Sequence, residues 1–169
     1  MTEIFTQRFS DGLKSEHYVQ AELEARGWCV LPFGRNIFPD DFNKAIEKFR
    51  DTYGHECRLR WLPDLLVMRP GDPHSLQAVE VKRHRGTFGI ERSALNVYSH
   101  LEQDFWLPVV IVFHCPDMVP ELHTIRTGRC FVSTLPKFGN PEGFSGRALY
   151  HVDQNETSDM DAIFGAKKQ

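Results

Sequence analysis

The sequence predicts an α/β fold in which helices pack against a mixed β-sheet. Segments with helical and strand patterns alternate along most of the chain, which is typical of layered α/β folds. Residues 107–113 (LPVVIVF) are nearly all apolar and β-branched, as in a strand that is buried on both faces. Residues 61–68 and 76–82 are apolar runs around the turn sequence RPGDP, and they predict an antiparallel hairpin.

The elements before the hairpin follow from spacing and from stop signals. Residues 1–12 are polar and are expected to form an irregular lead-in. Apolar positions at helical spacing predict a helix over 13–26, with Gly27 where it ends. Residues 28–33 are expected to form the first strand, and 41–53 a second, shorter helix.

After the hairpin, residues 91–105 are expected to form a helix that leads into the buried strand. Further strands are expected within 123–134 and over 147–152, separated by a loop rich in glycine and proline at 136–146. We expect one domain over residues 1–169, with a core at about 13–113 and a C-terminal extension over 114–169.

Composition excludes several classes of protein. A hydrophobic content of 41% and a charged content of 25% are those of a globular chain. No apolar run approaches the roughly 20 residues of a membrane span. Four cysteines without paired spacing, and the lack of a signal peptide, predict reduced thiols and a cytoplasmic location. The net charge of −3 is not that of a strongly basic nucleic-acid binder, so any binding charge must be local.

The chemically informative residues lie in the hairpin. Glu80 and Lys82 point to one face of their strand because side chains alternate, while Val81 points to the other. Asp64, after Pro63, precedes the apolar run of the partner strand, where pairing can bring its carboxylate beside Glu80. Charges at the edge of an apolar sheet are costly unless they are paired or hold a metal.

This set of groups suits a divalent cation. Mg²⁺ prefers oxygen ligands and keeps several waters, so Asp64, Glu80 and the main-chain carbonyl of Val81 are candidate ligands, with Mn²⁺ able to substitute. Such a cation acidifies water and neutralises charge on a phosphate. Lys82 can orient the water or stabilise the phosphorane-like transition state as a point charge.

Pro63-Asp64 followed by Glu80-Val81-Lys82 resembles the signature of the PD-(D/E)xK nucleases, a superfamily that includes restriction enzymes and archaeal-type Holliday junction resolvases. Resolvase-like members carry a glutamate early in the first helix, eleven residues before a glycine-aromatic pair. Glu16 stands eleven residues before Gly27-Trp28. The resemblance covers about residues 13–113.

The resemblance implies a restriction-endonuclease-like three-layer core, with a central mixed sheet flanked by helices. It also implies Mg²⁺-dependent endo- or exonucleolytic hydrolysis of DNA, duplex or branched, and a possible homodimer. By resemblance, Asp64 and Glu80 are metal ligands, Lys82 is the catalytic lysine, and Glu16 is a further carboxylate at the metal or water.

Basic side chains near the motif are candidates for contact with DNA phosphates, which supply most non-specific affinity. They are Arg58, Arg60, Arg83, Arg85 and Arg92. On the helix over 91–105, Tyr98, His100 and Gln103 are further candidates to face the site.

Two other functions remain open. One is a nucleic-acid-binding module of the same fold without turnover, which would not need Asp64, Glu80 and Lys82 together. The other is an interaction protein stabilised by zinc, bound by residues such as Cys115, Cys130, His114 or His123, whose spacing does not match common zinc motifs.

Overall fold

The computed structural model describes residues 3–53, 58–83, 89–116, 129–134, 142–144, 147–151 and 157–168. The helices are α1 (Glu3–Ala25), α2 (Asp40–Tyr53), α3 (Arg92–Phe105) and α4 (Met160–Phe164), with 3₁₀ helices η1 (Arg35–Ile37) and η2 (Arg58–Trp61). The strands are β1 (Cys29–Pro32), β2 (Leu65–Arg69), β3 (Asp72–Arg83), β4 (Gly89–Glu91), β5 (Val109–Cys115), β6 (Arg129–Thr134), β7 (Glu142–Phe144), β8 (Arg147–His151) and β9 (Ser158–Asp159).

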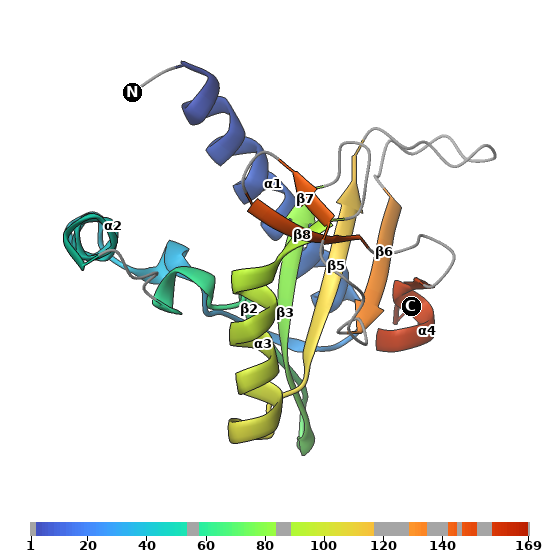
Figure 1. Ribbon diagram of the computed structural model, residues 1–169. Coiled ribbons are helices and arrows are strands. Elements are labelled where there is room, and N and C mark those ends of the chain that lie inside the picture. The colour runs from blue at the N-terminus through green and yellow to red at the C-terminus, as the bar shows by residue number, and fades with distance from the viewer. Residues whose placement is uncertain are drawn as a thin grey trace.

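The main sheet is mixed and has the strand order β1-β2-β3-β5-β6-β9. The predicted hairpin is confirmed, since β2 pairs antiparallel with β3 and places Leu65 opposite Val79. The pairing of β3 with β5 is parallel, and α3 makes the crossover between these two strands. A smaller sheet, of order β4-β8-β7, lies beside α3 (Figure 1).

Helices cover both faces of the main sheet, with α1 and α4 on one face and α3 on the other (Figure 1). Alternation along β3 and β5 explains the two hydrophobic cores. Ala78 and Ile111 point into the core under α3, whereas Val79 and Val112 point into the core under α1. Every residue of β5 is buried, as its apolar sequence predicts. The expected three-layer arrangement is therefore confirmed.

The expected lead-in at 1–12 is wrong, because α1 is already helical at Glu3. The sequence offers few apolar residues there, but the helix gains a tertiary partner. Asp11, which is buried, pairs with Arg83 at the end of β3 over 2.6 Å, and the Ser15 hydroxyl donates to the Asp11 carbonyl. The other end of α1 is as predicted, since Gly27 adopts a positive φ of 83° just beyond it.

The C-terminal half differs more from expectation. The segment expected to be a loop contains β7, which is a strand because it pairs antiparallel with β8. The short elements β4, β9 and α4 carry too few residues for a periodic pattern, so the sequence did not indicate them. Strands β6 and β8 agree with the expected strands at 123–134 and 147–152, of which 123–128 and 152 lie outside the described residues.

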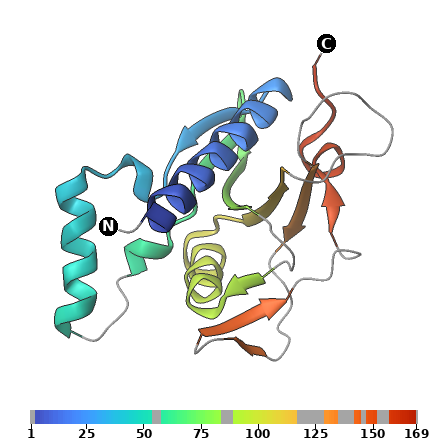
Figure 2. The same cartoon turned by 90° about the horizontal axis from the view of Figure 1, so that it is seen from above.

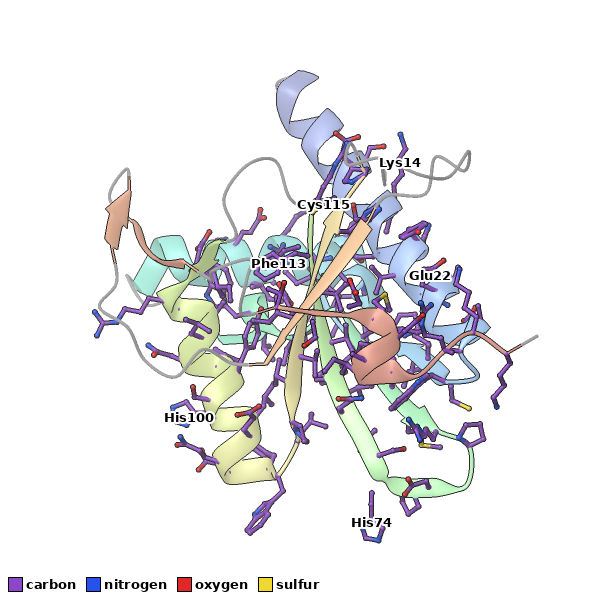
Figure 3. The ribbon with its side chains drawn as sticks, turned by 90° about the vertical axis from the view of Figure 1, so that its right-hand side faces the viewer. Lys14, Glu22, His74, His100, Phe113 and Cys115 are labelled. Carbon is purple, nitrogen blue, oxygen red and sulfur yellow. The ribbon has the colours of Figure 1, made fainter. Side chains whose placement is uncertain are left out.

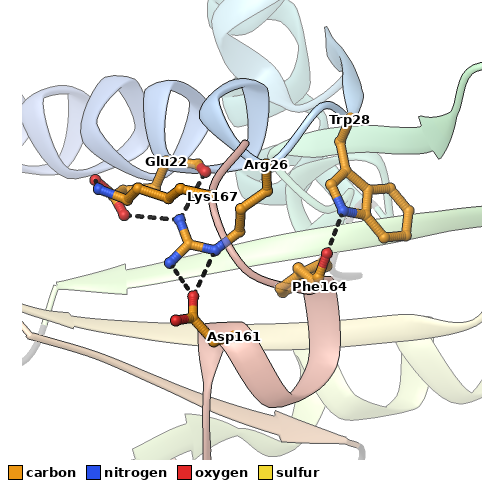
Figure 4. A network of polar contacts seen from close by, with 6 residues as sticks. All are labelled: Glu22, Arg26, Trp28, Asp161, Phe164 and Lys167. Atoms are coloured by element: carbon orange, nitrogen blue, oxygen red, sulfur yellow. Dashed lines mark hydrogen bonds and ion pairs between the residues drawn. The ribbon is translucent and has the colours of Figure 1, made fainter. Parts of the chain in front are cut away.

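A four-residue cluster that we call the clamp attaches the C-terminal segment to α1 (Figure 4). It consists of Glu22, Arg26, Asp161 and Lys167. The Arg26 guanidinium donates to Glu22 at 2.8 Å and also to Asp161, and Lys167 donates to Glu22 at 2.8 Å. The clamp therefore fixes the outer layer of the α1 face.

The chain between β1 and β2 forms an extension that we call the arm, described over residues 35–53 and 58–61. Figure 2 shows its helix α2 standing apart from the main sheet. Arg35 holds the base of α2 by donating to Asn43 and Glu47. Within the described ranges, none of the helices is both long and apolar enough to span a membrane.

Candidate active site

Asp64 lies where the arm returns to the sheet, immediately before β2. Its main-chain carbonyl accepts hydrogen bonds from the amides of Phe33 at 2.8 Å and Gly34 at 3.1 Å. Its side-chain Oδ2 accepts a hydrogen bond from the amide of Val81 at 2.8 Å. The side chain thus binds β3 just beyond the point where the pairing of β2 with β3 begins, and this fixes the carboxylate at the end of β2.

Glu80 and Lys82 lie on the same face of β3, as predicted, and face the α3 side of the sheet. The Lys82 ammonium donates to Glu80 Oε1 in a close ion pair. Glu80 is buried, with 5% of its surface exposed, whereas 32% of the Lys82 side chain remains exposed. The Glu80 side chain is therefore more deeply buried than the Lys82 side chain taken as a whole.

Val81 lies between these two residues and contributes its main chain. Its side chain packs in the core under α1, so only the peptide groups can reach the site. The N–H and C=O of one strand residue face the same neighbouring strand. Because the Val81 amide donates to Asp64, the Val81 carbonyl also faces the Asp64 side of β3.

The pKa of Asp64 is raised well above its usual value of 3.8. Burial is the largest cause, followed by the negative charges of Glu80 and Glu16. Lys82 and the hydrogen bond from Val81 act in the opposite direction but do not outweigh them. We call Glu16, Asp64, Glu80 and Lys82 the site cluster, because the charges of Glu16, Glu80 and Lys82 all act on the Asp64 carboxyl. The site cluster thus contains three acidic groups and one basic group.

Lys82 keeps its proton in this setting. Burial acts to lower the pKa of the ammonium, but the negative charges of Glu80 and Asp64 and the hydrogen bond to Glu80 raise it above the usual value. A lysine with a raised pKa is a poor general base at neutral pH. In the site cluster, Lys82 therefore serves as a fixed positive charge.

Helix α3 adds Tyr98, which is wholly buried and whose hydroxyl hydrogen-bonds to Glu80. Burial, and then the negative charge of Glu80, raise the pKa of Tyr98, so the phenol stays protonated. Of the three α3 candidates, only Tyr98 faces the site. His100 lies on the outer side of α3 and contacts Asp104 at 2.9 Å (Figure 3), and Gln103 is exposed.

One acidic residue near the site was missed by the sequence reasoning. Glu91, at the N-cap position of α3, adds negative charge that acts on both Lys82 and Tyr98. It lies seven residues before Tyr98, a spacing that places two residues on the same side of a helix. Once Tyr98 is a candidate, this spacing in the sequence could have identified Glu91 as a neighbour of the site.

The side chains of only two of the five arginines that are candidates for DNA contact lie within the described residues. Arg83 pairs with Asp11 on the α1 side, and Arg92 is exposed at the first residue of α3. Arg85 and the side chains of Arg58 and Arg60 lie outside the described residues. Their proposed contact with DNA stays a prediction.

The described residues contain no cluster of three or more His, Cys, Asp or Glu side chains that could hold a metal ion. The expected set instead combines two carboxylates, Asp64 and Glu80, with the Val81 carbonyl. Cys115 is buried and forms no disulfide within the described ranges, whereas the side chain of Cys130 and the whole of His123 lie outside them.

Comparison with known proteins gives a structural match. No protein-family model and no curated protein matches the sequence. Among solved structures, the chain is similar to Hjc, a Holliday junction resolvase from the archaeal hyperthermophile Archaeoglobus fulgidus. The TM-score is 0.55 at 11% sequence identity, over 94% of this chain and 99% of that chain. The chain has a restriction-endonuclease-like fold. At this identity the likeness establishes the fold alone.

Proposed function

We propose that this protein is a nuclease that hydrolyses DNA phosphodiester bonds with the help of a divalent cation, Mg²⁺ or Mn²⁺. The observation that carries the proposal is the excess of negative charge in the site cluster. The negative charges of Glu80 and Glu16 act on the Asp64 carboxyl, and Lys82 supplies the opposing positive charge. Burial is the largest cause of the raised pKa of Asp64, and this excess of negative charge raises it further.

The residues fit a hard divalent cation. Carboxylate and carbonyl oxygens are the ligands that Mg²⁺ prefers, and it retains waters at its other positions. Asp64, Glu80 and the Val81 carbonyl would hold the ion. When bound, it would supply Lewis-acid chemistry, with neutralisation of phosphate charge and acidification of water. A cation would also remove the repulsion that now opposes ionisation of Asp64.

The side chains have separable roles in the proposed reaction. A water oxygen bonds to phosphorus as the water loses a proton, one bridging P–O bond breaks, and the leaving oxygen takes a proton from solvent to become a hydroxyl. Glu16 would orient the water and accept its proton. Lys82, held protonated by Glu80 and Asp64, would stabilise the negative charge that grows on the phosphate oxygens. Tyr98 would hold the Glu80 carboxylate in place through its hydroxyl.

The likeness to Hjc supports DNA as the substrate and suggests branched DNA as one form of it. The alternative, a binding module of the same fold, does not require this combination of carboxylates and lysine. The joint presence of Asp64, Glu80 and Lys82 in one cluster therefore favours an enzyme.

The test is cleavage of labelled linear duplex, single-stranded DNA and a four-way junction, with Mg²⁺, Mn²⁺ or EDTA. Wild type is compared with Asp64→Ala and Lys82→Ala, and with Asp104→Asn on the outer surface of α3 as a control. We expect cation-dependent cutting by wild type and by the control, and none by the two site variants. Binding without cutting by wild type would favour the binding module. Equal cutting by all four proteins would place the active site elsewhere.

A further inference from the structure

Gly34 lies where the chain leaves β1 and enters the arm, and it packs directly on Asp64. It is buried, and its amide donates to the Asp64 carbonyl at 3.1 Å, next to the parallel hydrogen bond from Phe33. Both ends of the arm therefore meet at one residue of the site cluster. At Gly12, Gly27, Gly71 and Gly165, by contrast, none of the nearest atoms to a Cβ belongs to the site cluster.

A side chain at Gly34 has no free space. An ideal Cβ would lie 3.0 Å from the Asp64 Cα, 3.1 Å from the Pro63 carbonyl oxygen and 3.3 Å from Asp64 Oδ1. The first two atoms belong to the main chain and cannot rotate away. A Cβ would therefore push Asp64 by a few tenths of an ångström, since such contacts are tighter than packed interiors tolerate.

The requirement for glycine does not come from the backbone conformation. Gly34 has φ −72° and ψ −165°, which are open to any residue. Alanine could adopt the same dihedral angles, so its cost would arise wholly from contact with Asp64. The contact bears on the proposed cation-binding carboxylate itself, because Asp64 Oδ1 is one of the three nearest atoms.

We infer that Gly34 is a positioning residue for Asp64, an inference that rests on the proposed nuclease function. Asp64 is held on two sides. The Val81 amide binds Oδ2 on the β3 side, and the bare Cα of Gly34 supports the main chain and Oδ1 on the arm side. Catalytic groups need placement within about 0.5 Å, so a displacement of a few tenths of an ångström is large enough to matter.

The decisive variant is Gly34→Ala, with Gly12→Ala as its matched control. Gly12 lies in α1, and a Cβ there meets nothing within 4 Å. We expect Gly34→Ala to lower kcat for DNA cleavage by about 10- to 100-fold, with KM within about twofold, because misplacement affects the reacting geometry more than substrate binding. Gly12→Ala should keep the wild-type kcat. If Gly34 were only structural, the loss would follow the folded fraction and disappear on cooling.

A second measurement follows the displacement without relying on turnover. The amide resonance of Val81 in ¹H–¹⁵N NMR spectra reports its hydrogen bond to Asp64 Oδ2. We expect this resonance to shift in Gly34→Ala and to stay in place in Gly12→Ala. An unmoved Val81 resonance together with wild-type kcat would overturn the inference. If wild type does not cut DNA, the proposed function fails, and the Val81 resonance alone then decides whether Gly34 positions Asp64.

Discussion

Two clusters of partly buried charged side chains in this protein differ in the balance of their acidic and basic groups. In the clamp, two carboxylates (Glu22 and Asp161) face two cations (Arg26 and Lys167). In the site cluster, three carboxylates (Glu16, Asp64 and Glu80) are accompanied by one cation, Lys82. Both clusters use side chains from α1, and both tie the helix layer to another part of the fold. The difference is whether the charges balance.

The pKa values follow that difference. Burial acts to raise the pKa of Glu22, but hydrogen bonds from Lys167 and Arg26 outweigh it and lower the pKa below 4.5. For Asp64, burial and the charges of Glu80 and Glu16 act together, and the pKa rises. A balanced cluster stabilises the folded chain. An unbalanced one costs stability, and such a cost is typical of a functional site.

The largest effect should come from neutralising one carboxylate in each cluster and measuring DNA cleavage. Glu80→Gln removes a cation ligand and the partner of Lys82, so kcat should fall by about 100-fold or more. Glu22→Gln, in the clamp, should cut at the wild-type rate at a temperature where it is folded. Similar losses in both variants would mean that the site cluster has no special role.

A smaller effect is expected when Tyr98 is replaced by Phe. This change removes only the hydroxyl that hydrogen-bonds to Glu80, and a single hydrogen bond contributes about 1 kcal/mol. Cleavage should slow by about 5- to 10-fold in kcat. The cation concentration for half-maximal activity should rise, because Glu80 is less well held. An unchanged cation dependence would show that Tyr98 does not position Glu80.

Stability should change in opposite directions in the two clusters. Asp64→Asn keeps an acceptor for the Val81 amide but removes a repelled charge, so the free energy of unfolding in EDTA should rise by about 1 kcal/mol. Glu22→Gln loses its charge-assisted hydrogen bonds to Arg26 and Lys167, so its free energy of unfolding should fall by about 1 kcal/mol. Urea unfolding monitored by circular dichroism measures both. Changes of the same sign would contradict the comparison.

The smallest effect is the pH dependence of those differences. The Glu22 pKa is lowered by folding, so its contribution is present above pH 4.5 and is lost as the pH falls through its folded value. The stability gap between wild type and Glu22→Gln should therefore close in acid. The Asp64 pKa is raised, so wild type should lose stability relative to Asp64→Asn as the pH rises above 3.8. If the stability difference between wild type and one of these variants did not change with pH, the pKa direction assigned to that residue would be wrong.

The sequence was sufficient for the parts of the fold with strong periodicity. The hairpin, the crossover helix over 92–105 and the buried strand β5 all agree with their apolar patterns. Part of the site could be predicted for the same reason. Side chains alternate along β3, so Glu80 and Lys82 lie on one face of this strand regardless of the rest of the chain. The motif then located Asp64 next to them.

Other features depend on partners that are distant in the sequence. The first turns of α1 are helical where Asp11 meets Arg83, 72 residues later, and no local pattern announces this pair. The α4 segment is a helix of only five residues, and Trp28 donates to its Phe164 carbonyl at 2.8 Å. The role of Gly34 could not be predicted from the sequence for the same reason, since the need for glycine there arises from its contact with Asp64.

The most direct test of the central claim is calorimetric titration of Mn²⁺ into wild type, Asp64→Asn and Glu22→Gln in the absence of DNA. We predict one bound ion in wild type and in Glu22→Gln, with binding weakened by at least about 10-fold in Asp64→Asn. That result would show that the unbalanced cluster, and not the balanced one, is the cation site. Equal binding by wild type and Asp64→Asn, or no binding by wild type, would contradict the account.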